Sequence, residues 1–184
     1  MKSILPFDEI NRLEAQIREV FAKGTLSRAE YEDILDWMLD LFLLAYATGN
    51  EVTNESLSSA WKPSLDDVME TVDRNVAGAT WRDRVKDYFE NGGSAEDIIR
   101  IVETEAHRDA NEAALRTAEE VGAKSKKWIT RLDDRVRDTH IYLEGQSVPI
   151  DARFYTFDGD SAPAPGMFSL PENNVNCRCE LSFE

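Results

Sequence analysis

The chain has 184 residues, 42% of them hydrophobic, so it is long enough and apolar enough to bury a core of its own. Its net charge of −15 is spread over both halves and disfavours tight general binding to nucleic acid. The longest apolar stretch, Trp37 to Ala47, is interrupted by Asp40, and the N-terminus has no apolar signal segment. We therefore expect no membrane span, no secretion, and a protein made in a cytoplasm.

The first two predicted helices lie between Asp8 and Ala47. Apolar residues recur at three- and four-residue steps up to Lys23, and Ser27-Arg-Ala-Glu30 forms a capping box that starts the second helix. That second helix is apolar on nearly all sides. It is therefore expected to be either a central core helix or a surface that binds a partner.

Three further helices are predicted before the middle of the chain, after a polar turn at Gly49-Asn50. They cover residues 55–61, 64–77 and 80–90. Asn91-Gly-Gly93 then interrupts the pattern. We place a boundary there, between a helical region for docking or oligomerisation, residues 1–93, and a second region, residues 94–184.

The second region begins with the longest predicted helix, which runs from Ser94 to about Val121 and has an alanine-rich later half suited to close packing. From Lys126 onward the pattern changes to short alternating stretches, a long loop over residues 158–171, and a closing strand that turns Cys177 and Cys179 inward. The predicted fold class is α+β: an N-terminal helical region followed by a small, mostly β C-terminal module packed on a long helix.

His140, Cys177 and Cys179 have the side chains of a zinc site, which would take its fourth ligand from Asp138, His107 or a water. The spacing is unusual, because structural zinc sites normally use Cys-x-x-Cys on a turn. The two cysteines are also explained as small inward-facing hydrophobic residues with reduced thiols. Zinc is therefore a hypothesised cofactor beside a simple packing role.

Two charged groupings surround these residues. We expect one structural polar cluster that joins the long helix to the C-terminal module, with these members: Glu105, Arg108, Asp133, Arg137, Asp138 and His140. The only locally basic stretch suggests a weak, salt-sensitive nucleic-acid contact through these side chains: Lys124, Lys126, Lys127, Arg131 and Arg135.

Several spaced residues, taken together, resemble the head-morphogenesis domain family typified by the phage Mu F protein. The matching pattern is Thr104-Glu105 with Arg108, then Trp128, Asp133, Arg137, His140, Gly145, Phe154, Pro165-Gly166 and Asn176-Cys-Arg-Cys179. The resemblance covers roughly residues 95–184. It implies a minor capsid protein of a tailed phage or prophage, with a structural and non-enzymatic role in head assembly and no nucleophile or cofactor to carry over.

The resemblance also implies partners and a location. The expected partners are the portal protein, capsid proteins or further copies of the chain, with a weak DNA contact in some members. The expected location is the virion, in the head interior or portal region, after assembly in the host cytoplasm.

An enzyme is the alternative hypothesis. The cluster of Glu105, His140, Cys177 and Cys179 would then be the active site of a metal-dependent hydrolase or of a phage-delivered effector. An open cleft at His140 and Glu105 would favour this alternative, and a closed, packed cluster would favour a structural role. We prefer the structural role because no arrangement of nucleophile, base and orienting group can be read from the sequence.

Overall fold

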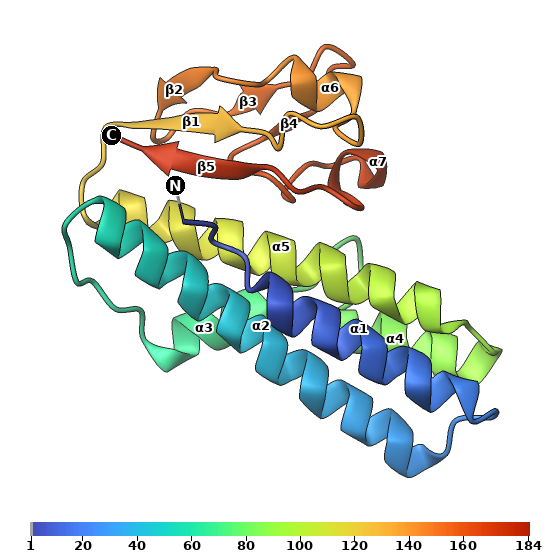
Figure 1. Cartoon of the computed structure of the whole chain (residues 1–184). Coiled ribbons are helices and arrows are strands. Elements are labelled where there is room, and N and C mark those ends of the chain that lie inside the picture. The colour runs from blue at the N-terminus through green and yellow to red at the C-terminus, as the bar shows by residue number, and fades with distance from the viewer. Residues whose placement is uncertain (1) are drawn as a thin grey trace.

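The computed structural model describes residues 2–184 and has a layer of helices with a small β module above it (Figure 1). The helices are α1 (Phe7–Ala22), α2 (Arg28–Ser56), α3 (Leu65–Val72), α4 (Trp81–Asn91) and α5 (Ala95–Glu120). Capping boxes start the last four of them, at Ser27, Ser64, Thr80 and Ser94. The α+β class predicted from the sequence is confirmed.

Helix α2 is longer than predicted, because it continues through Gly49 and the expected turn and ends at Ser56. The short helix expected at 55–61 does not form as a separate element, since only its first two residues are helical and they belong to α2. The reason is a close helix crossing. A Cβ atom on Gly49 would lie 2.2 Å from the carbonyl oxygen of Ala110 in α5. Glycine therefore acts here as a contact residue that lets two backbones approach, and it does not end the helix.

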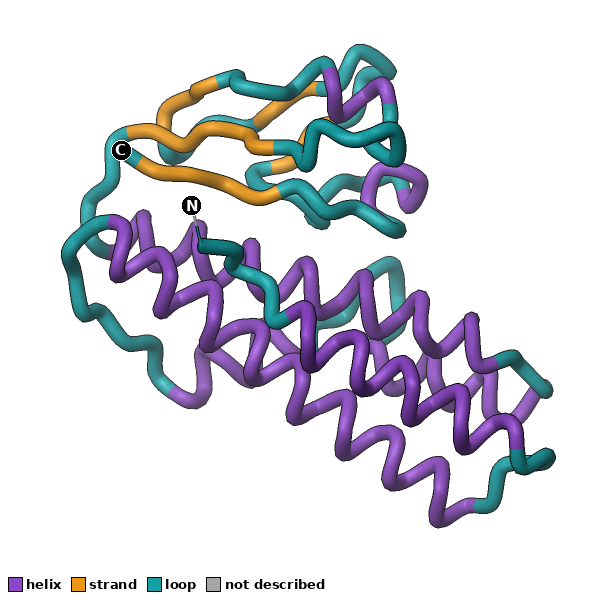
Figure 2. The backbone as a smooth tube through the Cα atoms, in the orientation of Figure 1, coloured by secondary structure: helices purple, strands orange, loops and turns teal. Residues whose placement is uncertain are grey.

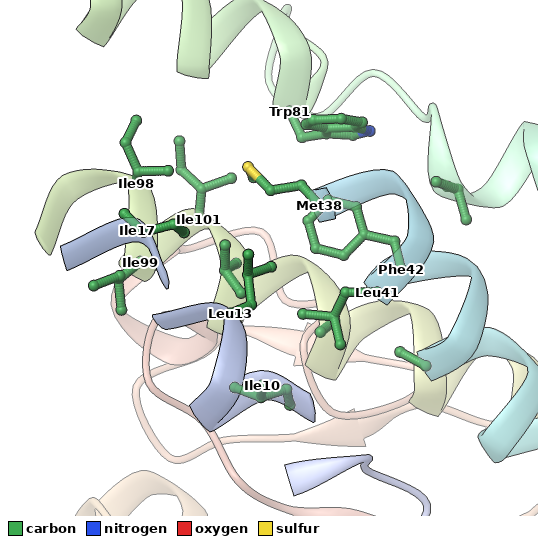
Figure 3. Packing of buried hydrophobic residues seen from close by; sticks show 14 of the residues in the cluster. Ile10, Leu13, Ile17, Met38, Leu41, Phe42, Trp81, Ile98, Ile99 and Ile101 are labelled. Carbon is green, nitrogen blue, oxygen red and sulfur yellow. The ribbon is translucent and has the colours of Figure 1, made fainter. Parts of the chain in front are cut away.

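The core of the helical layer is built around α2. Its apolar side chains pack against α1, α4 and α5, and Figure 3 shows Met38, Leu41 and Phe42 of α2 facing residues of those helices. The ring of Phe42 meets the edge of Trp81, with 5.1 Å between ring centroids and an interplanar angle of 84°. Of the two roles considered for this helix, the structure shows the central core helix, since this chain itself covers the apolar side chains.

The β module contains a three-stranded antiparallel sheet in the order β2-β1-β5 and a two-stranded ribbon of β3 and β4 (Figure 2). Their bounds are β1 (Ser125–Ile129), β2 (Ser147–Pro149), β3 (Phe154–Tyr155), β4 (Ser161–Ala162) and β5 (Glu180–Phe183). Two short helices, α6 (Asp138–Ile141) and α7 (Pro171–Asn174), lie at one end of the module. The first strand, β1, ends at Ile129, and Leu132 adopts a positive φ of 54° in the turn that follows.

Helix α5 joins the two layers. Its alanine-rich half is buried, with Ala106, Ala110 and Ala114 in the helical core. The loop at Gly166 comes so close on the module side that a Cβ there would lie 3.1 Å from the Cα of Arg108. The module has its own small core around Trp128, Phe154 and Leu181. Helix α5 therefore packs against both the helical layer and the β module, and the predicted boundary at residue 93 lies just before this shared helix.

The N-terminal segment crosses from the helices to the sheet. The backbone N–H of Ile4 and the hydroxyl of Ser3 both donate to the carboxylate of Glu180, which also pairs with Arg131. Ile4 and Leu5 are buried. None of the helices in residues 2–184 is both long enough and apolar enough to span a membrane.

Candidate functional site

The structure divides the expected six-residue polar cluster into separate groups. Glu105 on α5 forms ion pairs with Arg108 on the same helix and with Arg84 on α4. His140 lies in the β module among aromatic rings and thiols. The carboxylate that we expected beside the imidazole therefore belongs to the interface between α5 and α4, because its guanidinium partners are there.

Asp109 lies next to this ion-pair group and is a buried carboxylate that sequence reasoning passed over. Its nearest charged partner is Arg108, at 3.7 Å, and neither carboxylate oxygen has a hydrogen-bond partner among residues 2–184. Burial raises the pKa of Asp109 well above its usual value, against the opposing charge of Arg108. A buried carboxylate that accepts no hydrogen bond from residues 2–184 favours the protonated form.

His140, Cys177 and Cys179 are brought together, as the sequence suggested. The Nδ1 atom of His140 lies 3.5 Å from the Sγ of Cys177 and 3.4 Å from the Sγ of Cys179. These three ligand atoms all lie within 4.8 Å of one another, and all three side chains are buried. We call this group the imidazole–thiol cluster.

Aromatic rings fix the imidazole of the imidazole–thiol cluster. Phe168 stacks on the His140 ring, with 5.4 Å between centroids and an interplanar angle of 27°. Trp128 meets the same ring edge-on, at 5.4 Å and 75°. The imidazole therefore packs against two aromatic rings from separate parts of the module, and its Nδ1 atom faces the two sulfur atoms.

The two thiols come from the segment just before β5, which begins at Glu180 rather than at the cysteines. Asn176 has a positive φ of 57°, and the N–H of Cys177 donates to the carbonyl of Asn174, so a tight turn precedes the pair. Burial opposes ionisation of both thiols. The pKa of Cys177 is nevertheless lowered, because Cys177 hydrogen-bonds with Cys179 and lies near the positive charges of Arg137 and Arg178. The pKa of Cys179 is raised, because of the same hydrogen bond with Cys177 and because of burial.

His107 supplies the link between α5 and this segment. Its Nε2 donates to the main-chain carbonyl of Cys179 at 2.7 Å, and Asn111 donates to the same oxygen at 3.3 Å. His107 was one of the ligands expected for the fourth position of a zinc site, but its Nε2 lies against the carbonyl oxygen of Cys179. The i, i+4 spacing of His107 and Asn111 was the available signal, since residues at that spacing share one helix face.

The remaining members of the expected cluster hold the loop around the thiols. Both terminal nitrogens of the Arg178 guanidinium donate to the carboxylate of Asp133, Nη1 to Oδ2 at 2.8 Å and Nη2 to Oδ1 at 2.7 Å. Arg137 donates to the main-chain carbonyl of Val175. The hydrogen bond from Arg178 lowers the pKa of Asp133. Asp138 is exposed at the start of α6. These pairs fix the backbone on either side of the cysteines.

The basic stretch is not uniformly exposed. Lys126 is only 1% exposed because it points inward from β1, and burial lowers its pKa to about 8. The other four side chains proposed for nucleic-acid contact are exposed: Lys124, Lys127, Arg131 and Arg135. Arg131 is already paired with Glu180, so at most three unpaired cations of this set remain at the surface.

An exposed aromatic patch lies on the β module. Tyr142 is 56% exposed and Phe157 is 62% exposed, and their rings meet edge-on with 6.0 Å between centroids. Their sequence neighbours Ile141 and Tyr155 are exposed as well. We call Tyr142 and Phe157, whose rings are in contact, the aromatic patch. Large apolar side chains gathered at the surface are typical of contact sites for other proteins.

Comparison with known proteins identifies a family and two relatives. A family model described as "Phage Mu protein F like protein" matches residues 50–182. The Minor head protein GP7 of Bacillus phage SPP1 is 32% identical over 83 residues, which cover 44% of this chain and 27% of that protein. The NAD(+)–arginine ADP-ribosyltransferase EFV of Enterococcus faecalis (strain ATCC 700802 / V583) is 37% identical over 94 residues, which cover 49% of this chain and 19% of that protein.

The chain therefore matches only about a fifth and about a quarter of the lengths of these two relatives. No solved structure matches the chain significantly. The family match begins within α2 and extends into β5, so it contains α5, the imidazole–thiol cluster and the aromatic patch.

Proposed function

This chain belongs to the Phage Mu protein F like family, and we propose on that basis that it is a minor head protein of a tailed phage or prophage, with a structural role in procapsid assembly at or near the portal. The observation that carries the proposal is the family match over residues 50–182 together with the similarity to a minor head protein of Bacillus phage SPP1.

The packing of the polar groups supports a structural role over the alternative of a hydrolase or effector. Substrate would have to reach Glu105 and His140 in that alternative, and these side chains are 1% and 2% exposed. Both are held by partners within the fold. Groups closed in this way fix the position of helices and loops, and they are poorly placed to touch a substrate.

The similarity to an arginine ADP-ribosyltransferase does not change this proposal. It covers 19% of that enzyme, which is too little of the enzyme to carry its activity to this chain. A shared segment can recur in proteins with different activities, because function depends on the site and not on the fold.

The aromatic patch is the part of the surface that we propose contacts another head protein. Helix α2 was the other candidate, but most of its apolar side chains pack into the core of the chain, and Leu44 is its one large apolar side chain among the exposed residues of the described chain. Tyr142 and Phe157 offer a pair of large exposed rings, and such rings are enriched at the centres of protein interfaces. The partner class is a portal or capsid protein of the same phage, which also places the chain in the virion head. A weak contact with packaged DNA through the exposed basic residues belongs to the same proposal.

Co-expression tests this function. The chain is produced together with the portal and major capsid proteins of the same phage, particles are purified, and the chain is quantified in them. We expect it to co-purify with portal or procapsid particles. The double variant Tyr142→Ser/Phe157→Ser is expected to reduce incorporation by about tenfold or more, as loss of central aromatic contacts does at other interfaces.

Leu65→Ser is the matched control, since Leu65 is 72% exposed but lies on α3 in the helical layer. It should be incorporated normally. A wild-type chain that stays a free monomer and never enters particles would overturn the assembly role. Normal incorporation of the double variant would leave the assembly role standing and remove the aromatic patch from it.

A further inference from the structure

We propose that the imidazole–thiol cluster binds a zinc ion, which ties α6 to the segment before β5. The proposal rests on the geometry of His140, Cys177 and Cys179, and it does not depend on the role in head assembly. It concerns a structural ion, because all three ligand side chains are buried.

The nitrogen–sulfur distances fit zinc. Zinc bonds of about 2.0–2.1 Å to nitrogen and about 2.3 Å to sulfur, at a tetrahedral angle, place nitrogen and sulfur roughly 3.5 Å apart. The Nδ1 atom of His140 lies 3.5 Å and 3.4 Å from the two sulfur atoms. One imidazole and two thiols form a soft donor set, which suits zinc better than magnesium or calcium.

The fold holds these ligands in place from several directions. The His140 ring lies between Phe168 and Trp128. The main chain of Cys179 is held by His107, and the guanidinium of Arg178, between the two cysteines, is held by Asp133. Ligands that are fixed before the ion arrives lose little conformational freedom on binding, which favours affinity.

The fourth coordination position is left to a water molecule. A cavity of about 10 Å³ adjoins the three ligands and is lined also by Arg137 and Asn176. That volume is about the size needed for one water. Neither Asp138 nor His107, the two other ligands considered, belongs to the group of ligand atoms that the structure brings within 4.8 Å.

The same atoms have a second explanation that the experiment must separate from the first. The sulfur–nitrogen distances also fit thiols that share protons with the imidazole, in which case the cysteines are small packing residues. The two explanations differ in metal content, in spectrum and in the effect of added zinc on stability.

The test uses the purified full chain. Its metal content is measured, the metal is removed with a chelator, and zinc is added back in competition with a chromophoric chelator. Cobalt(II) is bound in parallel as a spectroscopic probe. We expect one zinc per chain, a rise in melting temperature on adding zinc, and a cobalt spectrum with thiolate charge-transfer bands and the strong visible bands of tetrahedral coordination.

Three variants locate the ligands. Cys177→Ser and Cys179→Ser are each expected to lower zinc affinity by more than about 100-fold, a larger loss than outer-shell changes cause. Asp138→Asn is the control, because it alters an exposed carboxylate two residues from His140, and it should bind zinc as the wild type does. A loss of binding in Asp138→Asn would overturn the assignment of the fourth position to water.

Cobalt binding by the wild-type chain keeps the proposal testable even if a serine variant does not fold. The proposal is overturned if purified protein holds no stoichiometric zinc and cobalt gives no thiolate bands. It is equally overturned if metal-free protein melts at the same temperature with and without added zinc. Neither result would bear on whether the chain enters procapsids, so failure of this proposal and failure of the assembly role are distinguishable.

Discussion

The Nε2 atom of His107 donates a hydrogen bond to the main-chain carbonyl of Cys179 at 2.7 Å, across 72 positions of sequence. This bond connects α5, the helix shared by both layers, to the segment that carries both thiols. It also fixes the tautomer of His107, because a carbonyl can only accept.

The first prediction concerns this bond. His107→Leu removes the closer of the two donors to the buried carbonyl of Cys179 and is expected to lower the free energy of unfolding by about 1–3 kcal/mol. His107→Gln can keep a donor near the position of Nε2 and should lose less. Urea unfolding of the two variants measures the difference. Equal losses would mean that the volume of the side chain matters here and the hydrogen bond does not.

The second prediction contrasts Glu105 with Asp109, one helical turn apart on α5. Glu105 pairs with Arg84 and Arg108, so Glu105→Gln leaves buried positive charge unpaired and is expected to cost about 2–4 kcal/mol. Both oxygens of Asp109 lack hydrogen-bond donors within residues 2–184. Asp109→Asn should therefore be nearly as stable as the wild type at pH 7, or more stable.

The pH dependence of Asp109→Asn has a definite sign. Burial raises the pKa of Asp109, with Arg108 and Arg74 opposing the shift and Glu105 and Glu112 adding to it. A carboxyl group whose pKa is higher in the folded state than in the unfolded state stabilises the folded protein at low pH. This contribution to the free energy of unfolding is lost as pH rises through the folded-state pKa. The stability of Asp109→Asn relative to wild type should therefore increase from pH 4 to pH 8 in parallel chemical denaturation series. A constant difference would show that Asp109 is ionised when folded.

The third prediction tests the crossing of α2 and α5. Gly49→Ala places a Cβ against the carbonyl of Ala110 and is expected to destabilise the fold by about 1–3 kcal/mol, even though alanine favours helices by about 1 kcal/mol over glycine. Glu51→Ala, at an exposed position two residues later, should change stability by less than about 0.5 kcal/mol. Thermal melts of both variants decide the point. A Gly49→Ala variant that melts above the wild type would contradict the close crossing.

The fourth prediction separates the buried lysine of β1 from its exposed neighbour. Burial lowers the pKa of Lys126 to about 8, so its unfavourable contribution is largest at neutral pH and is relieved as pH rises toward 10. Lys126→Met is expected to raise stability at pH 7 by about 1–3 kcal/mol and to flatten this dependence. Stability measured between pH 7 and pH 10 checks both statements.

The same pair of lysines tests the proposed DNA contact. Lys127→Met should weaken binding to duplex DNA at low salt and reduce the salt dependence, because Lys127 is exposed. Lys126→Met should leave binding unchanged. Fluorescence anisotropy with labelled duplex DNA measures both. Equal effects of the two variants, or no binding by the wild type, would remove this stretch as a DNA contact.

Local signals in the sequence determined where most helices begin, the order of helices before strands, and the family. Ser27, Ser64, Thr80 and Ser94 are each followed three positions later by an acidic residue, and each of the four forms a capping box at the start of a helix. The spaced motifs from Thr104-Glu105 to Asn176-Cys-Arg-Cys179 lie inside the family match. The sequence also singled out His140, Cys177 and Cys179 as one group.

Only the tertiary structure decided how these parts meet. Gly49 could be read as a turn or as a helix contact until Ala110 was seen beside it, and Glu105 could be placed with His140 until Arg84 was seen to face it. Helical and strand periodicity report which residues share a face of one element, and they hold no information on which face of a distant element lies opposite. Arg84 beside Glu105, the thiols beside His140 and Ala110 beside Gly49 all come from other elements, so packing between distant segments decided these contacts.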